Sequence, residues 1–137
     1  MICNELISLI WLAGGIHAAI VLANIPLPRK LEVKRNLSSV PDFLRQVFYV
    51  HWVYIVLIVA LFAVLCFAFA PELAGGSALG RFLSGFIAGF WLLRLVLQWF
   101  FYDRELRRQI PWMDGAYGVA LVTLIGIFGL AAVHAWK

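Results

Sequence analysis

Four polar residues lie within otherwise apolar stretches of this chain: His17, His51, Arg94 and Gln98. An ionisable side chain at the centre of a hydrocarbon layer costs about 3 kcal/mol on insertion scales, so such residues usually face the interior of a helix bundle or mark a site. These four residues are therefore where any chemistry of this chain is expected.

Arg94 is the most informative of the four, because a guanidinium group keeps its proton and needs an anion, a carbonyl or water. One interpretation is that its side chain extends along the helix to the lipid headgroups, toward Asp103 or Asp114. The other is that it meets an anionic group of a bound ligand. Gln98 lies one helical turn further on and shares its face. Arg94 and Gln98 are thus predicted to form a binding site for an anionic group.

His17 and His51 have two interpretations as well. Two imidazoles from different helices are a known way to hold a b-type haem, and Arg94 would then lie near a propionate. Alternatively, each histidine is neutral and forms hydrogen bonds to other helices. Haem b is accordingly the one cofactor that the sequence suggests, with His17 and His51 as its axial ligands.

Known catalytic motifs are missing from the chain. It has no HExxH, GxSxG or glycine-rich phosphate loop, and Cys3 and Cys66 form no CxxC pair. We therefore predict no catalytic residues and no metal site. A lipid- or quinone-interacting enzyme that uses His51 and Arg94 at the headgroup boundary is an alternative without a motif to support it.

The elements that position these residues follow from composition and length. Of 137 residues, 64% are hydrophobic and 13% are charged, compared with about 25% charged residues in an average soluble domain. A helix needs about 20 apolar residues to span a bilayer, and the chain supplies that length four times. We predict an all-α membrane protein with a single domain over residues 1–137, whose four transmembrane helices cover about 6–25, 40–70, 82–102 and 116–136.

The distribution of basic residues predicts the orientation of the bundle. Eight of the eleven Lys and Arg residues lie in the first and third loops, which predicts that these loops are cytoplasmic and that both termini are non-cytoplasmic. The basic residues bracket apolar runs instead of covering a solvated face, which argues against nucleic-acid binding. A multi-pass protein of the cell membrane is the expected location.

Small residues predict where the helices pack. The hydrophobic effect does not drive helices together in lipid, so association depends on close packing, and small residues let two helix backbones approach each other. They recur at Gly14 and Gly15 in the first span, at Gly85 and Gly89 in the third, and along the fourth. Together with polar residues that lack catalytic partners, they favour a non-catalytic accessory or assembly subunit, or a small lipid-binding helper. Its expected partners are membrane lipids, other membrane-protein subunits or further copies of the chain.

Overall fold

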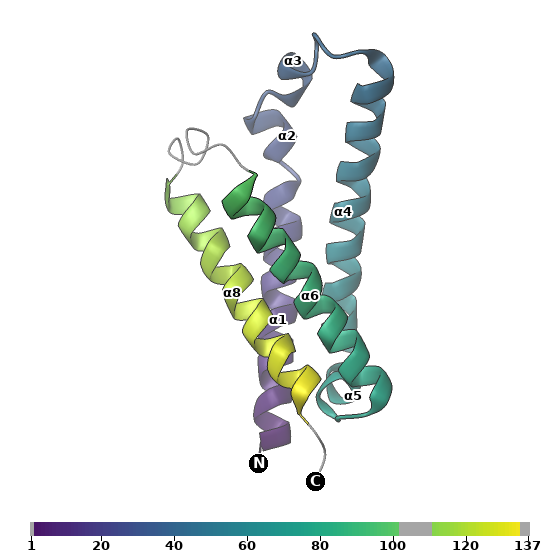
Figure 1. The fold of residues 1–137 in the computed structure, drawn as a ribbon, viewed down its shortest axis with the longest axis vertical. Coiled ribbons are helices and arrows are strands. Elements are labelled where there is room, and N and C mark those ends of the chain that lie inside the picture. The colour runs from purple at the N-terminus through teal and green to yellow at the C-terminus, as the bar shows by residue number, and fades with distance from the viewer. Residues whose placement is uncertain (1, 102–110, 135–137) are drawn as a thin grey trace.

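The computed structural model describes residues 2–101 and 111–134, and the described part of the chain is helical with no strand (Figure 1). Four long helices, each apolar and long enough to span a membrane, confirm the predicted all-α architecture. Their bounds are α1 Ile2–Asn24, α4 Asp42–Ala68, α6 Ala78–Phe100 and α8 Pro111–Val133. Short helices connect them: α2 Leu27–Lys30, α3 Val33–Asn36 and α5 Ala70–Ala74.

The helix starts differ from the predicted spans in one way that matters for the site. The helix α8 begins at Pro111, five residues before the predicted start at Ala116, so that Asp114 lies in its first turn. Glu5 and Asp42 occupy the first turns of α1 and α4. Negative charge is favoured at helix N-termini, so the first turn of each of these helices is a stable position for a carboxylate. The predicted cytoplasmic third loop lies largely outside the described residues.

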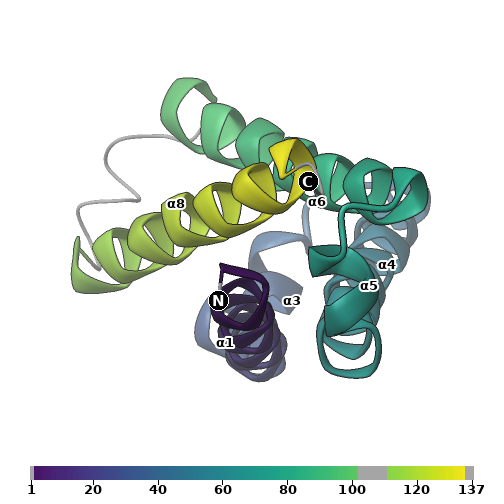
Figure 2. The ribbon, with the colours of Figure 1, turned by 90° about the horizontal axis from the view of Figure 1, so that it is seen from below.

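The four long helices pack as two pairs. The helix α1 packs along α4, and α6 packs along α8; contacts of α1 with α8 and of α5 with both α1 and α6 join the pairs. Figure 1 shows α4 standing apart from α6 over the half of the bundle that carries α3, with the start of α1 and the end of α8 at the opposite end. Figure 2 shows that α6 and α8 stand further apart where α6 ends and α8 begins.

Two of the predicted small-residue contacts are confirmed. A Cβ atom on Gly14 would lie 3.0 Å from both the Cβ of Cys66 and the ring of Phe67, so α1 and α4 approach closely there. A Cβ atom on Gly85 would lie 3.7 Å from that of Ala132, which places it against α8. Gly15 and Gly89, in contrast, have no atom of the described chain within 4 Å of such a Cβ. Only part of the small-residue pattern therefore serves packing within the bundle.

The turn between α4 and α6 folds into the bundle. Its short helix α5 buries Ala70, Leu73 and Ala74, and Gly76 leaves it with a φ of 69°, a conformation that favours glycine. The following helix begins with Ser77, whose hydroxyl accepts a hydrogen bond from the backbone N–H of Gly80 at 3.0 Å. The turn thus packs against α1 and α6 at the end of the bundle opposite α3.

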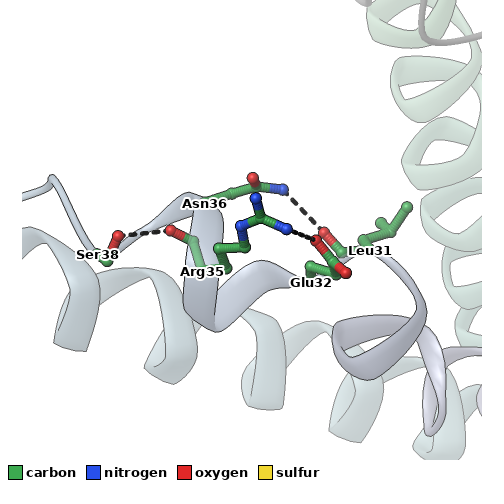
Figure 3. Close-up of polar contacts among 5 residues, drawn as sticks. All are labelled: Leu31, Glu32, Arg35, Asn36 and Ser38. Carbon is green, nitrogen blue, oxygen red and sulfur yellow. Dashed lines mark hydrogen bonds and ion pairs between the residues drawn. The ribbon is translucent and has the colours of Figure 1, made fainter.

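The loop between α1 and α4 is held by its own polar contacts (Figure 3). The Arg35 guanidinium donates to the Glu32 carboxylate at 3.2 Å, Asn36 donates to the Leu31 carbonyl at 2.9 Å, and Ser38 donates to the Arg35 carbonyl at 2.6 Å. Glu32 itself has a positive φ of 46°, which lets the chain turn between α2 and α3. These local contacts fold the basic segment into two short helical turns.

The outer surface of the bundle is covered by large apolar side chains. Residues on all four long helices are more than half exposed, among them Leu12, Leu57, Phe86 and Val122. In water such a surface would be a strong aggregation hazard, whereas in a bilayer it is the surface that lipid tails cover. The four long helices and this apolar exterior are compatible with an integral membrane protein.

Candidate functional site

His17 lies at the centre of the bundle and is fully buried. Its ring comes from α1 and packs within 6 Å of the ring centroids of Phe62 on α4, Trp91 on α6 and Phe128 on α8. The thiol of Cys66 lies 4.0 Å from Nδ1 of His17. One side chain of α1 thus contacts each of the other three long helices.

Both ring nitrogens of His17 are used within the protein. The Ala13 carbonyl lies 2.7 Å from Nδ1 and can only accept, whereas the indole Nε1–H of Trp91 lies 2.9 Å from Nε2 and can only donate. The pair of bonds requires the neutral tautomer with its proton on Nδ1. This arrangement is the one expected for the neutral, hydrogen-bonded interpretation of His17, and a haem iron at Nε2 would have to displace Trp91.

His51 does not share this site. It lies on the exposed side of α4, where its Nδ1 is 2.8 Å from the Val47 carbonyl of its own helix. Phe62, the α4 residue that contacts His17, lies eleven positions further along the helix, which is about 16 Å at 1.5 Å per residue. The structure therefore does not bring His17 and His51 together as facing ligands, and haem binding stays a prediction without geometric support.

Gln98 is nearly buried, with 5% of its surface exposed, and lies between α6 and α8. Its side-chain Nε2 donates a hydrogen bond of 2.7 Å to the Asp114 carboxylate. The anion that Gln98 meets is thus supplied by the protein itself. Its Oε1 atom is buried and has no hydrogen-bond partner among the residues that the structure describes.

Arg94 lies one turn below Gln98 on α6 and is half-buried. Its guanidinium carbon is 5.5 Å from the centre of the Tyr117 ring on α8, a cation–π distance. Two polar contacts therefore lie one turn apart between the antiparallel helices α6 and α8: Arg94 with Tyr117, and Gln98 with Asp114. The predicted pair of Arg94 and Gln98 is therefore placed at one helix seam, and whether Arg94 meets a ligand anion stays a prediction.

A groove of about 380 Å³ opens along this seam between α6 and α8. Its walls are apolar apart from one polar cluster, and its lining consists of Leu95, Gln98, Trp99, Asp114, Gly115, Gly118, Val119, Val122 and Thr123. A Cβ atom on Gly115 or Gly118 would have no atom of the described chain within 4 Å, so these glycines leave the α8 wall open. An apolar groove with a few converging polar groups is the usual form of a small-molecule site.

A second, larger hollow of about 660 Å³ lies at the loop between α1 and α4. Pro28, Arg29, Glu32, Lys34, Arg35 and Tyr49 line it. Its basic residues outnumber the single carboxylate, which suits contact with anionic headgroups at a membrane surface. It is open, and its charged lining residues are all exposed, so its shape is less well defined than that of the groove.

Two partners in these sites were missed by reasoning from sequence. Trp91 was not singled out, although a tryptophan in the middle of a span, away from the interfacial positions that this residue prefers, indicates a buried hydrogen-bond donor. Asp114 was considered only as a partner of Arg94. Pro111 followed by an acidic residue three positions later is typical of a helix start and would have placed Asp114 inside α8.

Comparison of the chain with protein-family models, with curated proteins and with solved structures finds no match.

Proposed function

We propose that this protein is a non-catalytic integral membrane protein that holds a membrane lipid in the groove between α6 and α8. One observation carries the proposal: the apolar groove ends at Gln98, a buried side chain whose Oε1 has no donor among the described residues. A buried polar atom without a partner costs about 1–3 kcal/mol. A ligand that supplies the donor would recover that cost.

The shape of the groove supports a lipid over a small soluble substrate. Its α8 wall is thinned by Gly115 and Gly118, and it continues along Val119 and Val122, two exposed residues of the apolar exterior. An acyl chain can lie along such a wall while its headgroup reaches the polar end.

The distribution of basic residues supports one orientation of the protein in the membrane. The basic loop between α1 and α4 lies at one end of the bundle, and the start of α1 and the end of α8 lie at the other (Figure 1). By the excess of basic residues in cytoplasmic loops, we place the α2–α3 loop in the cytoplasm and both termini outside. Gln98 and Asp114 then lie toward the cytoplasmic leaflet of the cell membrane.

Filling the groove tests the proposal. We expect Gly118→Val to lower the amount of lipid that co-purifies with the protein several-fold, because the new side chain occupies the open α8 wall. Valine also has a better helix propensity than glycine, so the helix itself is not weakened. Bound lipid per protein is measured by mass spectrometry after gentle solubilisation and washing with detergent.

Gly126→Val is the matched control. Gly126 lies on the same helix, is exposed, has no described atom within 4 Å of an added Cβ, and does not line the groove. It should retain lipid as the wild type does. Equal lipid retention in the two variants would contradict lipid binding in the groove. If Gly118→Val instead released a co-purifying membrane protein, the groove would be an assembly surface and the protein an accessory subunit.

Arg94 is tested separately from the groove, because neither Arg94 nor Tyr117 lines it. If Arg94 meets an anionic group of a ligand, Arg94→Leu should lower the recovery of phosphate-bearing lipid, and Arg94→Lys should keep most of it because the positive charge remains. Phosphorus per protein is the measurement. Unchanged phosphorus, assembly and partner recovery in Arg94→Leu would show that Arg94 makes contacts only within the protein and does not bind a lipid phosphate.

A further inference from the structure

The hollow at the loop between α1 and α4 carries a net positive charge. Its lining includes three cationic side chains, Arg29, Lys34 and Arg35, and one carboxylate, that of Glu32. Three positive charges and one negative charge leave the lining with a net charge of +2. All four side chains are exposed, so a ligand from outside the protein can reach them. A ligand with two negative charges complements this hollow.

The two uncompensated charges belong to separate helical turns. The Arg35 guanidinium is already paired, because it donates to the Glu32 carboxylate at 3.2 Å (Figure 3). No ion pair among the described residues includes Arg29 or Lys34. Arg29 lies in α2 and Lys34 in α3, on either side of the turn at Glu32. The hollow therefore has two unpaired cations, and each is available to a different anionic group.

The hollow is large enough for a headgroup with more than one phosphate. Its volume of about 660 Å³ lies within the range of about 300–1,000 Å³ of small-molecule sites. Tyr49, a half-buried residue of α4, also lines it, so one part of its wall comes from outside the loop. Tyrosine is enriched at the level of lipid headgroups, which is the depth expected for the end of this bundle.

Exposed apolar side chains next to the lining residues favour a lipid over a soluble ligand. Leu31 is 42% exposed and precedes Glu32, and Phe48 is 45% exposed and precedes Tyr49. Basic residues interleaved with Leu and Phe are typical of a segment that lies at a membrane surface. Acyl chains attached to a headgroup in the hollow can cover these apolar side chains.

We infer that this hollow binds a lipid headgroup with two phosphate groups, such as that of cardiolipin, with one phosphate at Arg29 and the other at Lys34. The inference concerns a second site and does not depend on lipid in the groove between α6 and α8. Basic pockets at the cytoplasmic side of membrane helices bind headgroups of this class. Phosphatidylglycerol has one phosphate, so it can pair with only one of the two cations.

Competition between two anionic lipids tests the inference. The full-length protein is stripped of lipid, reconstituted in phosphatidylcholine that contains cardiolipin and phosphatidylglycerol at a molar ratio of one to two, and purified again. At this ratio both anionic lipids supply the same number of phosphates and acyl chains. Mass spectrometry counts the retained lipids. We expect cardiolipin to be retained about fivefold over phosphatidylglycerol per phosphate, as for one additional contact of a phosphate with a basic residue.

Single variants assign this preference to the two cations. Arg29→Gln and Lys34→Gln should each bring the retention ratio to within about twofold, because each leaves one unpaired cation in the hollow. Lys30→Gln is the matched control: Lys30 follows Arg29 in α2, is exposed and does not line the hollow. It removes the same charge from the same segment and should keep the wild-type ratio. None of the three positions is buried, so the variants should fold as the wild type does.

A soluble competitor tests the choice of a lipid. Glycerol 1,3-bisphosphate carries two phosphates and no acyl chain. It should leave the retained cardiolipin in place when it is added at the same concentration as the lipid. Displacement of cardiolipin at that concentration would overturn the assignment to a lipid and indicate a soluble bisphosphate.

The remaining outcomes separate this site from the groove. Equal retention of both anionic lipids per phosphate by the wild type would overturn the inference, as would an equal loss of preference in Lys30→Gln and Arg29→Gln. Loss of the preference in Gly118→Val, with Arg29→Gln unchanged, would place cardiolipin in the groove and also overturn it. The proposed function fails separately, through equal total lipid in Gly118→Val and Gly126→Val.

Discussion

Gly80→Ala should destabilise this protein by about 2–3 kcal/mol. A Cβ atom at this position would lie 2.2 Å from the backbone carbonyl oxygen of Glu72 and 3.1 Å from the Ser77 hydroxyl. The first of these is backbone, so α5 and the start of α6 must move apart to admit one methyl group. Overpacking of this kind costs about 1–3 kcal/mol, and at a backbone clash the upper part of that range applies.

Gly89→Ala provides the matched control for this prediction. It lies on the same helix, is exposed, and has no atom of the described chain within 4 Å of an added Cβ. Alanine is favoured over glycine within a helix by about 1 kcal/mol, so this variant should be as stable as the wild type or more stable. Thermal unfolding in detergent, followed by size-exclusion fluorescence, compares the two. A Gly80→Ala protein as stable as Gly89→Ala would show that α5 does not pack on α6 as described.

His17→Ala should also be strongly destabilising, by about 3 kcal/mol. The substitution removes a fully buried ring that packs against Phe62 and Phe128, and leaves a cavity where three helices meet α1. It also deprives the buried Trp91 indole N–H of its acceptor. Loss of this one side chain therefore removes contacts between α1 and each of the other three long helices.

A double-mutant cycle isolates the hydrogen bond within that effect. Trp91→Phe keeps most of the ring and removes the donor, so it should cost about 1 kcal/mol in the wild-type protein, within the range measured for hydrogen bonds between membrane helices. In the His17→Ala background it should cost almost nothing. A coupling energy of zero, measured by unfolding of the four proteins, would mean that His17 contributes by packing alone.

The candidate site was only partly predictable from sequence. Arg94, Gln98 and His17 stood out because polar residues are rare in apolar spans, and the structure places all three between helices. Their partners were harder to find. Trp91 and Asp114 belong to other elements, and which side chains meet across a seam depends on how each helix is rotated about its axis.

His51, in contrast, was predicted to be a site residue but lies away from the site. It looked equivalent to His17 because both are histidines within apolar stretches, yet it bonds to the Val47 carbonyl of its own helix on an exposed face. Periodicity around His51 carries no clear signal, since apolar residues surround it on all sides. A helix that faces lipid on one side and protein on the other is apolar on both, so hydropathy does not distinguish the two faces.

The sequence by itself determined that the chain forms four apolar helices, because each apolar run is as long as a helical span of a bilayer and a helix satisfies its own backbone hydrogen bonds there. It also predicted that any site would involve His17, His51, Arg94 or Gln98. Only the tertiary structure decided that His17 is a buried structural contact and that Gln98 meets Asp114 at a groove. Lipid is as apolar as the side chains it replaces, so the rotation and pairing of the helices depend on close packing and on a few polar contacts between residues far apart in the chain.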